Sequence, residues 1–382
     1  MPQPAGFVGV TANLGLKEGA DDFAVVAAPS GPVTSAAVFT RSRFAGASVL
    51  LSRASDVSAF RGVVTISKNA NVATGPTGEA NALEVRRLAA EVVGVRPEEL
   101  LVASTGVIGV QYPMDVLTPA LEKLAGTAGD ADFDAAAAAI MTTDTIAKIE
   151  TRTVGDATIT GIAKGVGMLE PDMATMLTYF FTDAAVPAAE LDAAFRRVVD
   201  RTYNAVSIDT DTSTSDTAAI FASGTAGAVD LDEFEAALYD AALALVKKIA
   251  SDGEGASKLI TVSVSGARDA DQAKRVGKAI VNSPLVKTAV HGADPNWGRV
   301  AMAIGKLREE TDISPENVRI AFGGTETYPA QVSANLLADL STYLSGDEVS
   351  IEVDLGIASG EFTVYGCDLT DGYIRINADY TT

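Results

Sequence analysis

The chain has 382 residues, 47% of them hydrophobic and only 6% aromatic, so a large core built mainly of Ala, Val, Leu and Ile is expected. Its net charge of −21 argues against nucleic-acid binding, which needs a basic surface. No apolar run reaches the roughly eighteen residues of a membrane span, and the start of the chain shows no secretory signal. The single cysteine, Cys367, excludes an intramolecular disulfide and favours a reducing cytoplasm.

A single histidine, His291, restricts the chemistry further. With one His and one Cys, the common zinc sites built from several such ligands cannot form, so we expect no metal. Any Ser-His-Asp scheme would have to use His291. An alternative base, such as an α-amine, is therefore a stronger candidate.

The first part of the chain predicts short strands separated by helices. Residues 79–93 form an amphipathic pattern that ends at Gly94, and residues 132–141 form an Ala-rich helix. Strands rich in β-branched or apolar residues are expected at 23–26, 36–39, 63–66, 100–103, 152–154 and 157–162, the last two joined by a turn at 155–156.

The second part continues this alternation. Helices are expected from Pro187 to about Tyr203, at 232–250 and at 271–281, with strands at 259–264, 318–322, 350–355 and 362–365. Because several strands come as hairpins, the pattern indicates an α/β or α+β fold of sheet layers covered by helices, not a doubly wound parallel sheet. Composition alone marks no domain boundary.

The segment from Lys164 to Leu177 (KGVGMLEPDMATML) carries the most specific chemistry. Thr175 follows the small residue Ala174 and precedes an apolar run. A strained peptide beside a hydroxyl group can undergo an N-to-O acyl shift, and hydrolysis of the resulting ester frees the α-amine of Thr175. Because an α-amine titrates at about 7.7–8, it can take the proton from its own threonine hydroxyl. In an ordinary strand, Thr175 would simply be a packing residue.

Three other positions are candidate site residues, each with a plainer alternative. Thr105 and Gly106 follow a short apolar strand and are candidates for an oxyanion hole, or else form an ordinary strand-to-helix turn. Lys164 is a candidate for binding a substrate carboxylate, or else is a surface lysine. Glu254, between two glycines at a helix end, is disfavoured by the helix dipole, which a cationic ligand or a loop salt bridge would explain.

Two polar segments are weaker candidates. Residues 209–216 (DTDTSTSD) resemble a calcium loop, but Thr214 replaces the required glycine and Ile220 the bidentate glutamate, so a polar strand or a ladder of turns is expected. Residues 291–299 (HGADPNWGR) gather the only His and the only Trp in an expected loop. This loop is interpreted as a hydrogen-bonded plug between layers, with a functional site as the alternative.

Together these segments resemble the glutamate/ornithine N-acetyltransferase family of arginine biosynthesis, also called ornithine acetyltransferases. The matching motifs occur in family order over essentially the whole chain: STGVIG at 104–109, MTTDT at 141–145, AKGVGM at 163–168, MATML at 173–177, SDGEG at 251–255, HGADPNWGR at 291–299 and INADYTT at 376–382.

The resemblance implies self-cleavage between Ala174 and Thr175, giving chains 1–174 and 175–382 with Thr175 as the N-terminal nucleophile. It implies a two-layer sheet-and-helix sandwich similar to N-terminal-nucleophile folds but with different connectivity. It also implies an assembly of two cleaved protomers, or a larger one, and no cofactor. The implied site residues are Thr105 and Gly106 for the oxyanion hole, and Thr142, Lys164, Thr175, Glu254, Asn377 and Thr382 for substrate binding.

The implied reaction is a ping-pong transfer of the acetyl group from N-acetyl-L-ornithine to L-glutamate through an acetyl-Thr175 ester. The segment Glu170-Pro171-Asp172 departs from many family members and resembles a subgroup found beside specialised-metabolite pathways. The pathway, and the use of acetyl-CoA as a donor, stay open. A self-processing amidase or aminopeptidase with water as acceptor is the alternative enzyme, and an uncleaved amino-acid-binding protein is the non-catalytic one.

Overall fold

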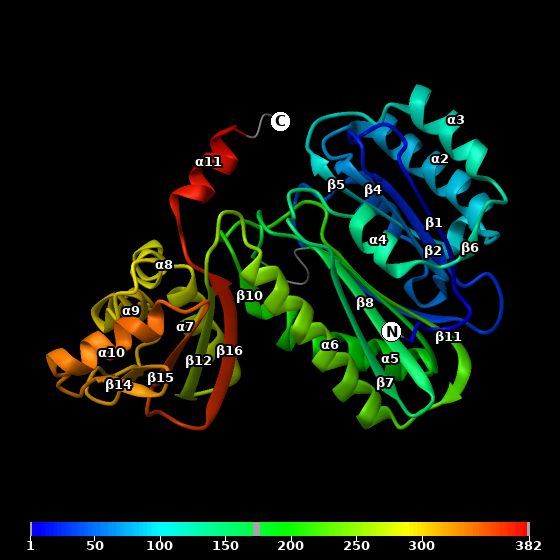
Figure 1. Cartoon of the computed structure of the whole chain (residues 1–382). Coiled ribbons are helices and arrows are strands. Elements are labelled where there is room, and N and C mark those ends of the chain that lie inside the picture. The colour runs from blue at the N-terminus through cyan, green and yellow to red at the C-terminus, as the bar shows by residue number, and fades with distance from the viewer. Residues whose placement is uncertain (1, 171–175, 380–382) are drawn as a thin grey trace.

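The computed structural model describes residues 2–170 and 176–379. Within them, the first part of the chain and the middle part build a sandwich of two facing sheets, and the rest builds a separate unit beside it (Figure 1). No helix of the described residues is both long and apolar enough to cross a membrane.

The first sheet has the strand order β5-β4-β2-β1-β6 and is covered on its outer face by helices α2 and α3. Its strands are β1 (Val8–Ala12), β2 (Phe23–Ala27), β4 (Gly62–Asn69), β5 (Leu100–Val107) and β6 (Gly129–Asp130). The helices of this part are α1 (Ala47–Arg53), α2 (Gly75–Val93), α3 (Met114–Leu124) and α4 (Phe133–Ala139). As predicted, α2 ends at Gly94, which has the left-handed φ of 71° that glycine adopts without strain.

The second sheet has the order β3-β11-β9-β8-β7 and packs on the first through a core that includes Tyr179, Phe181 and Phe221. Helices α5 and α6 cover its outer face. The elements are β3 (Thr34–Phe39), β7 (Lys148–Val154), β8 (Ala157–Lys164), β9 (Leu177–Ala185), α5 (Ala188–Arg201), β11 (Thr217–Ala228) and α6 (Leu231–Ser251). The result is a four-layer helix–sheet–sheet–helix sandwich.

The remaining unit has two layers, one sheet and a set of helices packed on one face of it. Its strand order is β10-β16-β12-β15-β13-β14. The strands are β10 (Val206–Ser207), β12 (Leu259–Ala267), β13 (Arg319–Phe322), β14 (Thr325–Tyr328), β15 (Glu348–Asp354) and β16 (Gly360–Cys367). The helices are α7 (Ala270–Val281), α8 (Pro284–His291), α9 (Trp297–Gly305), α10 (Ala334–Leu344) and the projecting α11 (Asp371–Asp379), and short 3-10 turns span Val57–Ala59, Pro97–Glu99 and Tyr203–Ala205 (Figure 1).

The mixed sheet-and-helix sandwich predicted from the sequence is confirmed, with more layers than the two expected. One local prediction was wrong, and one long strand was not predicted. Residues 291–299 are not one loop, because His291 ends α8 and Trp297 begins α9. The long strand β11 was not predicted, because its Ala- and Gly-rich sequence lacks the β-branched pattern of a strand.

Candidate active site

A cavity of about 320 Å³ lies where β5 and β8 end, beside the loops that precede β11 and follow α6. It brings together residues from widely separated parts of the chain. Six of the predicted site residues line it: Thr105, Gly106, Thr142, Lys164, Glu254 and Asn377. Met168 and the loop 213–215 complete much of the remaining wall.

Thr105 and Gly106 lie within the last part of β5, so the alternative of a strand-to-helix turn is wrong. In the parallel pairing of β4 with β5, Ser67 lies opposite Thr105 and Lys68 opposite Gly106. Gly106 has a φ of 134°, and a Cβ there would lie 2.2 Å from the carbonyl carbon of Lys68. Only glycine fits, so the backbone at the cavity wall is fixed by close strand packing.

Lys164 is a buried residue at the end of β8, only 9% exposed, so the surface-lysine alternative is wrong. Its Nζ donates a hydrogen bond to Oγ1 of Thr142 over 3.1 Å. Burial lowers the pKa of Lys164 from its ordinary value, and the Asp144 carboxylate opposes that shift. A buried ammonium group that faces a cavity is suited to bind a carboxylate.

The loop that carries Thr142 is held by a buried ion-pair network that was not predicted from the sequence. Nζ of Lys148 lies 2.7 Å from Oδ1 of Asp144 and 2.6 Å from Oδ2 of Asp252. Asp144 also accepts the backbone N–H of Gly165 at 2.8 Å. Burial favours a raised pKa for Asp144, but Lys164 and Lys148 outweigh it and keep the pKa below its ordinary value. The i,i+4 spacing of Asp144 and Lys148 was the only local signal.

Glu254 faces the cavity from the loop after α6. Its carboxylate accepts hydrogen bonds from Oγ1 of Thr143 at 3.0 Å and from Nδ2 of Asn377 in α11 at 2.9 Å. A Cβ on Gly167 would lie 2.5 Å from that carboxylate, so any side chain larger than that of glycine would collide with Glu254. No ion pair to Glu254 is found in residues 2–170 and 176–379, which leaves its negative charge available to a cationic group.

The acidic segment 209–216 supports the loop before the predicted cleavage point. Both oxygens of Asp209 accept backbone N–H groups, from Met168 at 2.7 Å and from Leu169 at 2.8 Å. Met168 has a left-handed φ of 50°, which this support maintains. The segment forms turns with one bridge between Leu169 and Thr212, so it is a set of turns and not a strand.

Glu170, the first acidic residue of the segment Glu170-Pro171-Asp172, does not line the cavity. It contacts the separate unit that contains β10 and α7. Its Oε2 accepts hydrogen bonds from Nδ2 of Asn282 at 2.5 Å and from Oγ of Ser207 at 3.1 Å. In this chain the acidic residue therefore joins the loop to the end of α7.

Ala174, Thr175 and Thr382 lie outside the described residues, so their predicted roles stay predictions. The described residue Met176 is buried and its carbonyl accepts a hydrogen bond from the backbone N–H of Thr217 at 2.9 Å. Leu177, the first residue of β9, pairs with Lys164.

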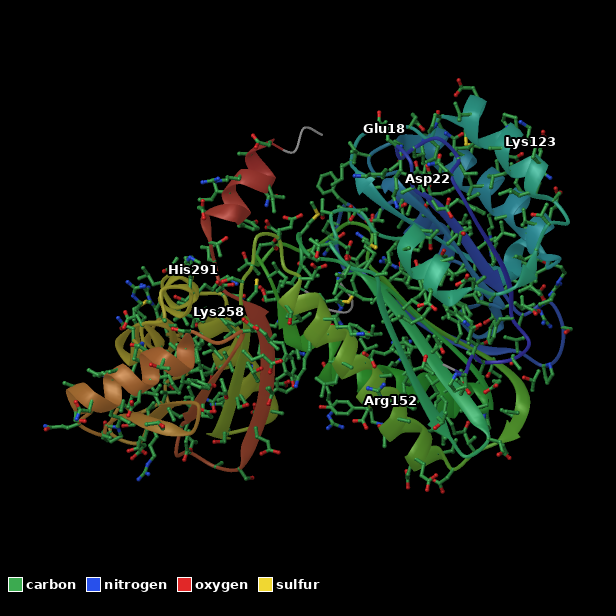
Figure 2. All side chains as sticks on the ribbon, viewed as in Figure 1. Glu18, Asp22, Lys123, Arg152, Lys258 and His291 are labelled. Atoms are coloured by element: carbon green, nitrogen blue, oxygen red, sulfur yellow. The ribbon has the colours of Figure 1, made fainter. Side chains whose placement is uncertain are left out.

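His291 is not among the residues that line the cavity. It lies on α8 in the separate unit (Figure 2). Its Nδ1 lies 2.9 Å from Oδ2 of Asp368 and 3.5 Å from Oγ of Ser257. A Ser-His-Asp relay needs the two partners on different ring nitrogens, whereas here both face Nδ1, so this cluster is no such relay.

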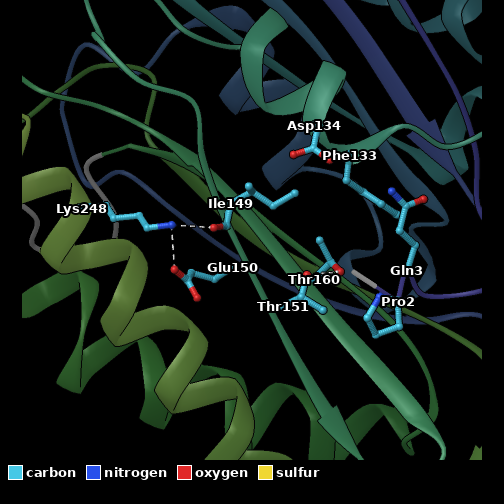
Figure 3. A pocket seen from close by; sticks show the side chains of 9 residues that line it. All are labelled: Pro2, Gln3, Phe133, Asp134, Ile149, Glu150, Thr151, Thr160 and Lys248. Atoms are coloured by element: carbon cyan, nitrogen blue, oxygen red, sulfur yellow. Dashed lines mark hydrogen bonds and ion pairs between the residues drawn. The ribbon is translucent and has the colours of Figure 1, made fainter.

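A second cavity, of about 150 Å³, lies between α4, β7, β8 and α6 (Figure 3). Lys248, the one cation among the described residues that line it, donates to the carbonyl of Ile149 at 2.8 Å and pairs with Glu150 at 2.7 Å. These contacts join α6 to β7. Within residues 2–170 and 176–379, no group of three or more His, Cys, Asp or Glu side chains is placed to hold a metal ion.

Comparison with known proteins gives consistent relatives. The model of the ArgJ family matches residues 9–382. The chain is 62% identical to the glutamate N-acetyltransferase Oat2 of Streptomyces clavuligerus, over 99% of this chain and 98% of that protein. It is 57% identical to the arginine biosynthesis bifunctional protein ArgJ of Rhodococcoides fascians, over 99% and 94% respectively. A crystal structure of ArgJ from Bacillus halodurans shares 40% identity with a TM-score of 0.49, covering 52% of this chain and 96% of that one.

Proposed function

The chain belongs to the ArgJ family, and on this basis we propose that it is a glutamate N-acetyltransferase of arginine biosynthesis that transfers the acetyl group of N-acetyl-L-ornithine to L-glutamate. The observation that carries the proposal is the single cavity that presents a buried cation, Lys164, and an anion, Glu254, beside the strand end at Thr105 and Gly106. Amino-acid substrates carry both charges, and an acyl transfer needs fixed hydrogen-bond donors.

In the proposed mechanism, the chain first cleaves itself between Ala174 and Thr175. The freed α-amine of Thr175 takes the proton of the Thr175 hydroxyl as its oxygen attacks the acetyl carbonyl. The Thr105 hydroxyl and the Gly106 N–H stabilise the oxyanion. Collapse of this intermediate breaks the amide C–N bond, and the proton passes to the leaving nitrogen of ornithine.

The second half of the reaction reverses these steps with glutamate. The neutral α-amine of glutamate attacks the acetyl ester, and the Thr175 oxygen leaves with a proton. Lys164 and Thr142 would bind the α-carboxylate shared by both amino acids, while Glu254, Asn377 and Thr382 would bind the rest of the substrate. Release of N-acetyl-L-glutamate restores the free threonine.

Cleavage in this position would leave the two products joined by strand pairing. β9 and β11 come after the cleavage point, and they lie between β3 and β8, which come before it. The backbone hydrogen bonds of one sheet would therefore hold chains 1–174 and 175–382 together. We further infer a cytoplasmic enzyme that assembles as two such pairs.

The proposal is tested by incubating the purified protein with N-acetylornithine, with and without glutamate. Transfer predicts that N-acetylglutamate forms in equal amount to the ornithine released, and that Thr175→Ala abolishes both. Release of acetate at the same rate with or without glutamate would instead identify an amidase and overturn the proposal. Replacing N-acetylornithine by acetyl-CoA in the same assay tests the second donor.

A further inference from the structure

The two substrates of the proposed reaction differ in the charge at the end of the side chain. N-acetylornithine carries an ammonium group there, whereas glutamate carries a second carboxylate. Among the residues that line the cavity, Lys164 is the one cation and Glu254 the one anion in the described part of the chain. An acceptor with two carboxylates therefore calls for a cation beyond Lys164.

Lys17 places a second ammonium group beside this site. Its Nζ donates to the carbonyl of Ala139, the last residue of α4, at 2.8 Å and to the carbonyl of Asp21 at 2.8 Å. Oγ of Ser67 donates to the same Ala139 carbonyl at 2.8 Å. Lys17 and Ser67 therefore share one carbonyl acceptor, and Ser67 is the strand partner of Thr105, although neither Lys17 nor Lys68 is among the described residues that line the cavity.

The loop that carries Lys17 is rigidly held. The buried carboxylate of Asp22 accepts three backbone N–H groups, from Leu14 at 2.7 Å, Leu16 at 2.6 Å and Lys17 at 2.9 Å. Glu18 and Asp22 mark this loop in Figure 2. Two carbonyls accept from the Lys17 ammonium, and its third N–H has no acceptor within residues 2–170 and 176–379. This donor is held in place and available.

Lys68 adds a third cation at an unusual backbone position. Its φ is 75°, a left-handed conformation that glycine would adopt without strain, and it lies opposite Gly106 in the sheet. Lys68 is a partly buried residue, and its ammonium makes no hydrogen bond or ion pair to any described residue. Burial lowers the pKa of Lys17 to about 8, Asp22 opposes this, and Lys68 and Lys164 lower the pKa further, so both of these ammonium groups lie within electrostatic range of Lys17.

We propose that Lys17 and Lys68 form a cationic subsite that receives the side-chain carboxylate of the acceptor amino acid, an inference that rests on the proposed function. The subsite explains why a strained position holds a lysine without a partner. With this subsite behind the cavity wall at Thr105 and Gly106, one active site could accept two substrates of opposite side-chain charge, because the donor's side-chain ammonium is directed to Glu254.

The test compares L-glutamate with L-glutamine as acceptor, since the two have nearly the same shape but glutamine carries an uncharged amide, with a donating NH2, in place of the side-chain carboxylate. Lys17→Met should lower kcat/KM for glutamate about 10- to 150-fold, the range expected for a lost hydrogen bond to a charged group. With glutamine the change should stay within about threefold, and Lys17→Arg should restore much of the preference for glutamate. Lys68→Gly should lower the same preference without loss of thermal stability, because glycine suits its backbone.

Two variants serve as controls. Lys123→Met removes an exposed lysine on α3 (Figure 2) and should leave the preference unchanged. Ala293→Gly relaxes another left-handed residue, in the separate unit, and controls for backbone effects.

An equal loss with glutamate and glutamine in Lys17→Met would show that Lys17 only braces α4 and would overturn the subsite. If Lys17→Met does not fold, an unchanged preference in Lys68→Gly overturns it as well. Both results differ from failure of the proposed function, in which the wild type makes no N-acetylglutamate.

Discussion

Replacing Gly167 by alanine should displace the Glu254 carboxylate from the active site. The new Cβ would lie 2.5 Å from both Cδ and Oε2 of Glu254, about 1 Å closer than ordinary van der Waals contact. Glu254 cannot simply rotate away, because Thr143 and Asn377 bind its two oxygens and its backbone N–H donates to the carbonyl of Val166 at 2.8 Å. The carboxylate must therefore give up one or both side-chain hydrogen bonds.

The expected decrease in kcat/KM follows from the hydrogen bond to Glu254 that the substrate loses. A hydrogen bond to a charged group is worth about 1.5–3 kcal/mol, which corresponds to about 10- to 150-fold in kcat/KM. A displacement of about 1 Å in a positioning residue has effects of the same order. We expect this loss for N-acetylornithine in steady-state assays of ornithine release.

Gly305→Ala is the matched control, because a Cβ at the end of α9 meets nothing within 4 Å. Circular dichroism and thermal melting should show that both variants fold. If Gly167→Ala has the same kinetics as Gly305→Ala, then Glu254 does not bind substrate as proposed.

The oxyanion hole, the buried ion pairs and the Lys17 ammonium each give a further prediction. Thr105→Val should lower the rate of acetyl transfer about 100- to 1,000-fold with little change in KM, measured by steady-state kinetics, and a normal rate would exclude its hydroxyl from the oxyanion hole. Asp144→Asn should destabilise the fold by about 3–5 kcal/mol, because Lys148 keeps only one carboxylate partner, and denaturant unfolding measures this. Lys17 binds its proton less tightly in the folded state, with a pKa of about 8 against 10.5, because burial outweighs Asp22 and Asp144 while Lys68 and Lys164 repel it. Between these values the unfolded state binds more protons, so the wild type should gain stability relative to Lys17→Met as pH rises from 8 to 10.5, and a constant difference would contradict the shift.

Much of the fold could be predicted because its signals are local. The helix of residues 79–93 and its Gly94 end, and the hairpin of β7 and β8, follow from periodicity and turn chemistry over a few residues. β11 could not be predicted this way. Its residues are mostly small, and it is a strand because it pairs with β3 and β9 across a large sequence separation.

The same distinction between local and long-range signals applies to the site. The chemistry of Thr105 and Lys164 could be inferred from their residue types and from the family resemblance, although the burial of Lys164 could not. The contact of Lys148 with Asp252 spans 104 residues, and only the folded chain brings the two together. The position of Lys17 beside Ser67 likewise depends on how α4 packs against the first sheet.

The most direct test of the account is intact-mass analysis of the purified enzyme after brief exposure to N-acetylornithine without glutamate. We expect two chains, residues 1–174 and 175–382, with one acetyl group on the second chain that disappears when glutamate is added. A fully active sample that consists of one uncut chain, or an acetyl group attached anywhere other than Thr175, would contradict the proposed mechanism.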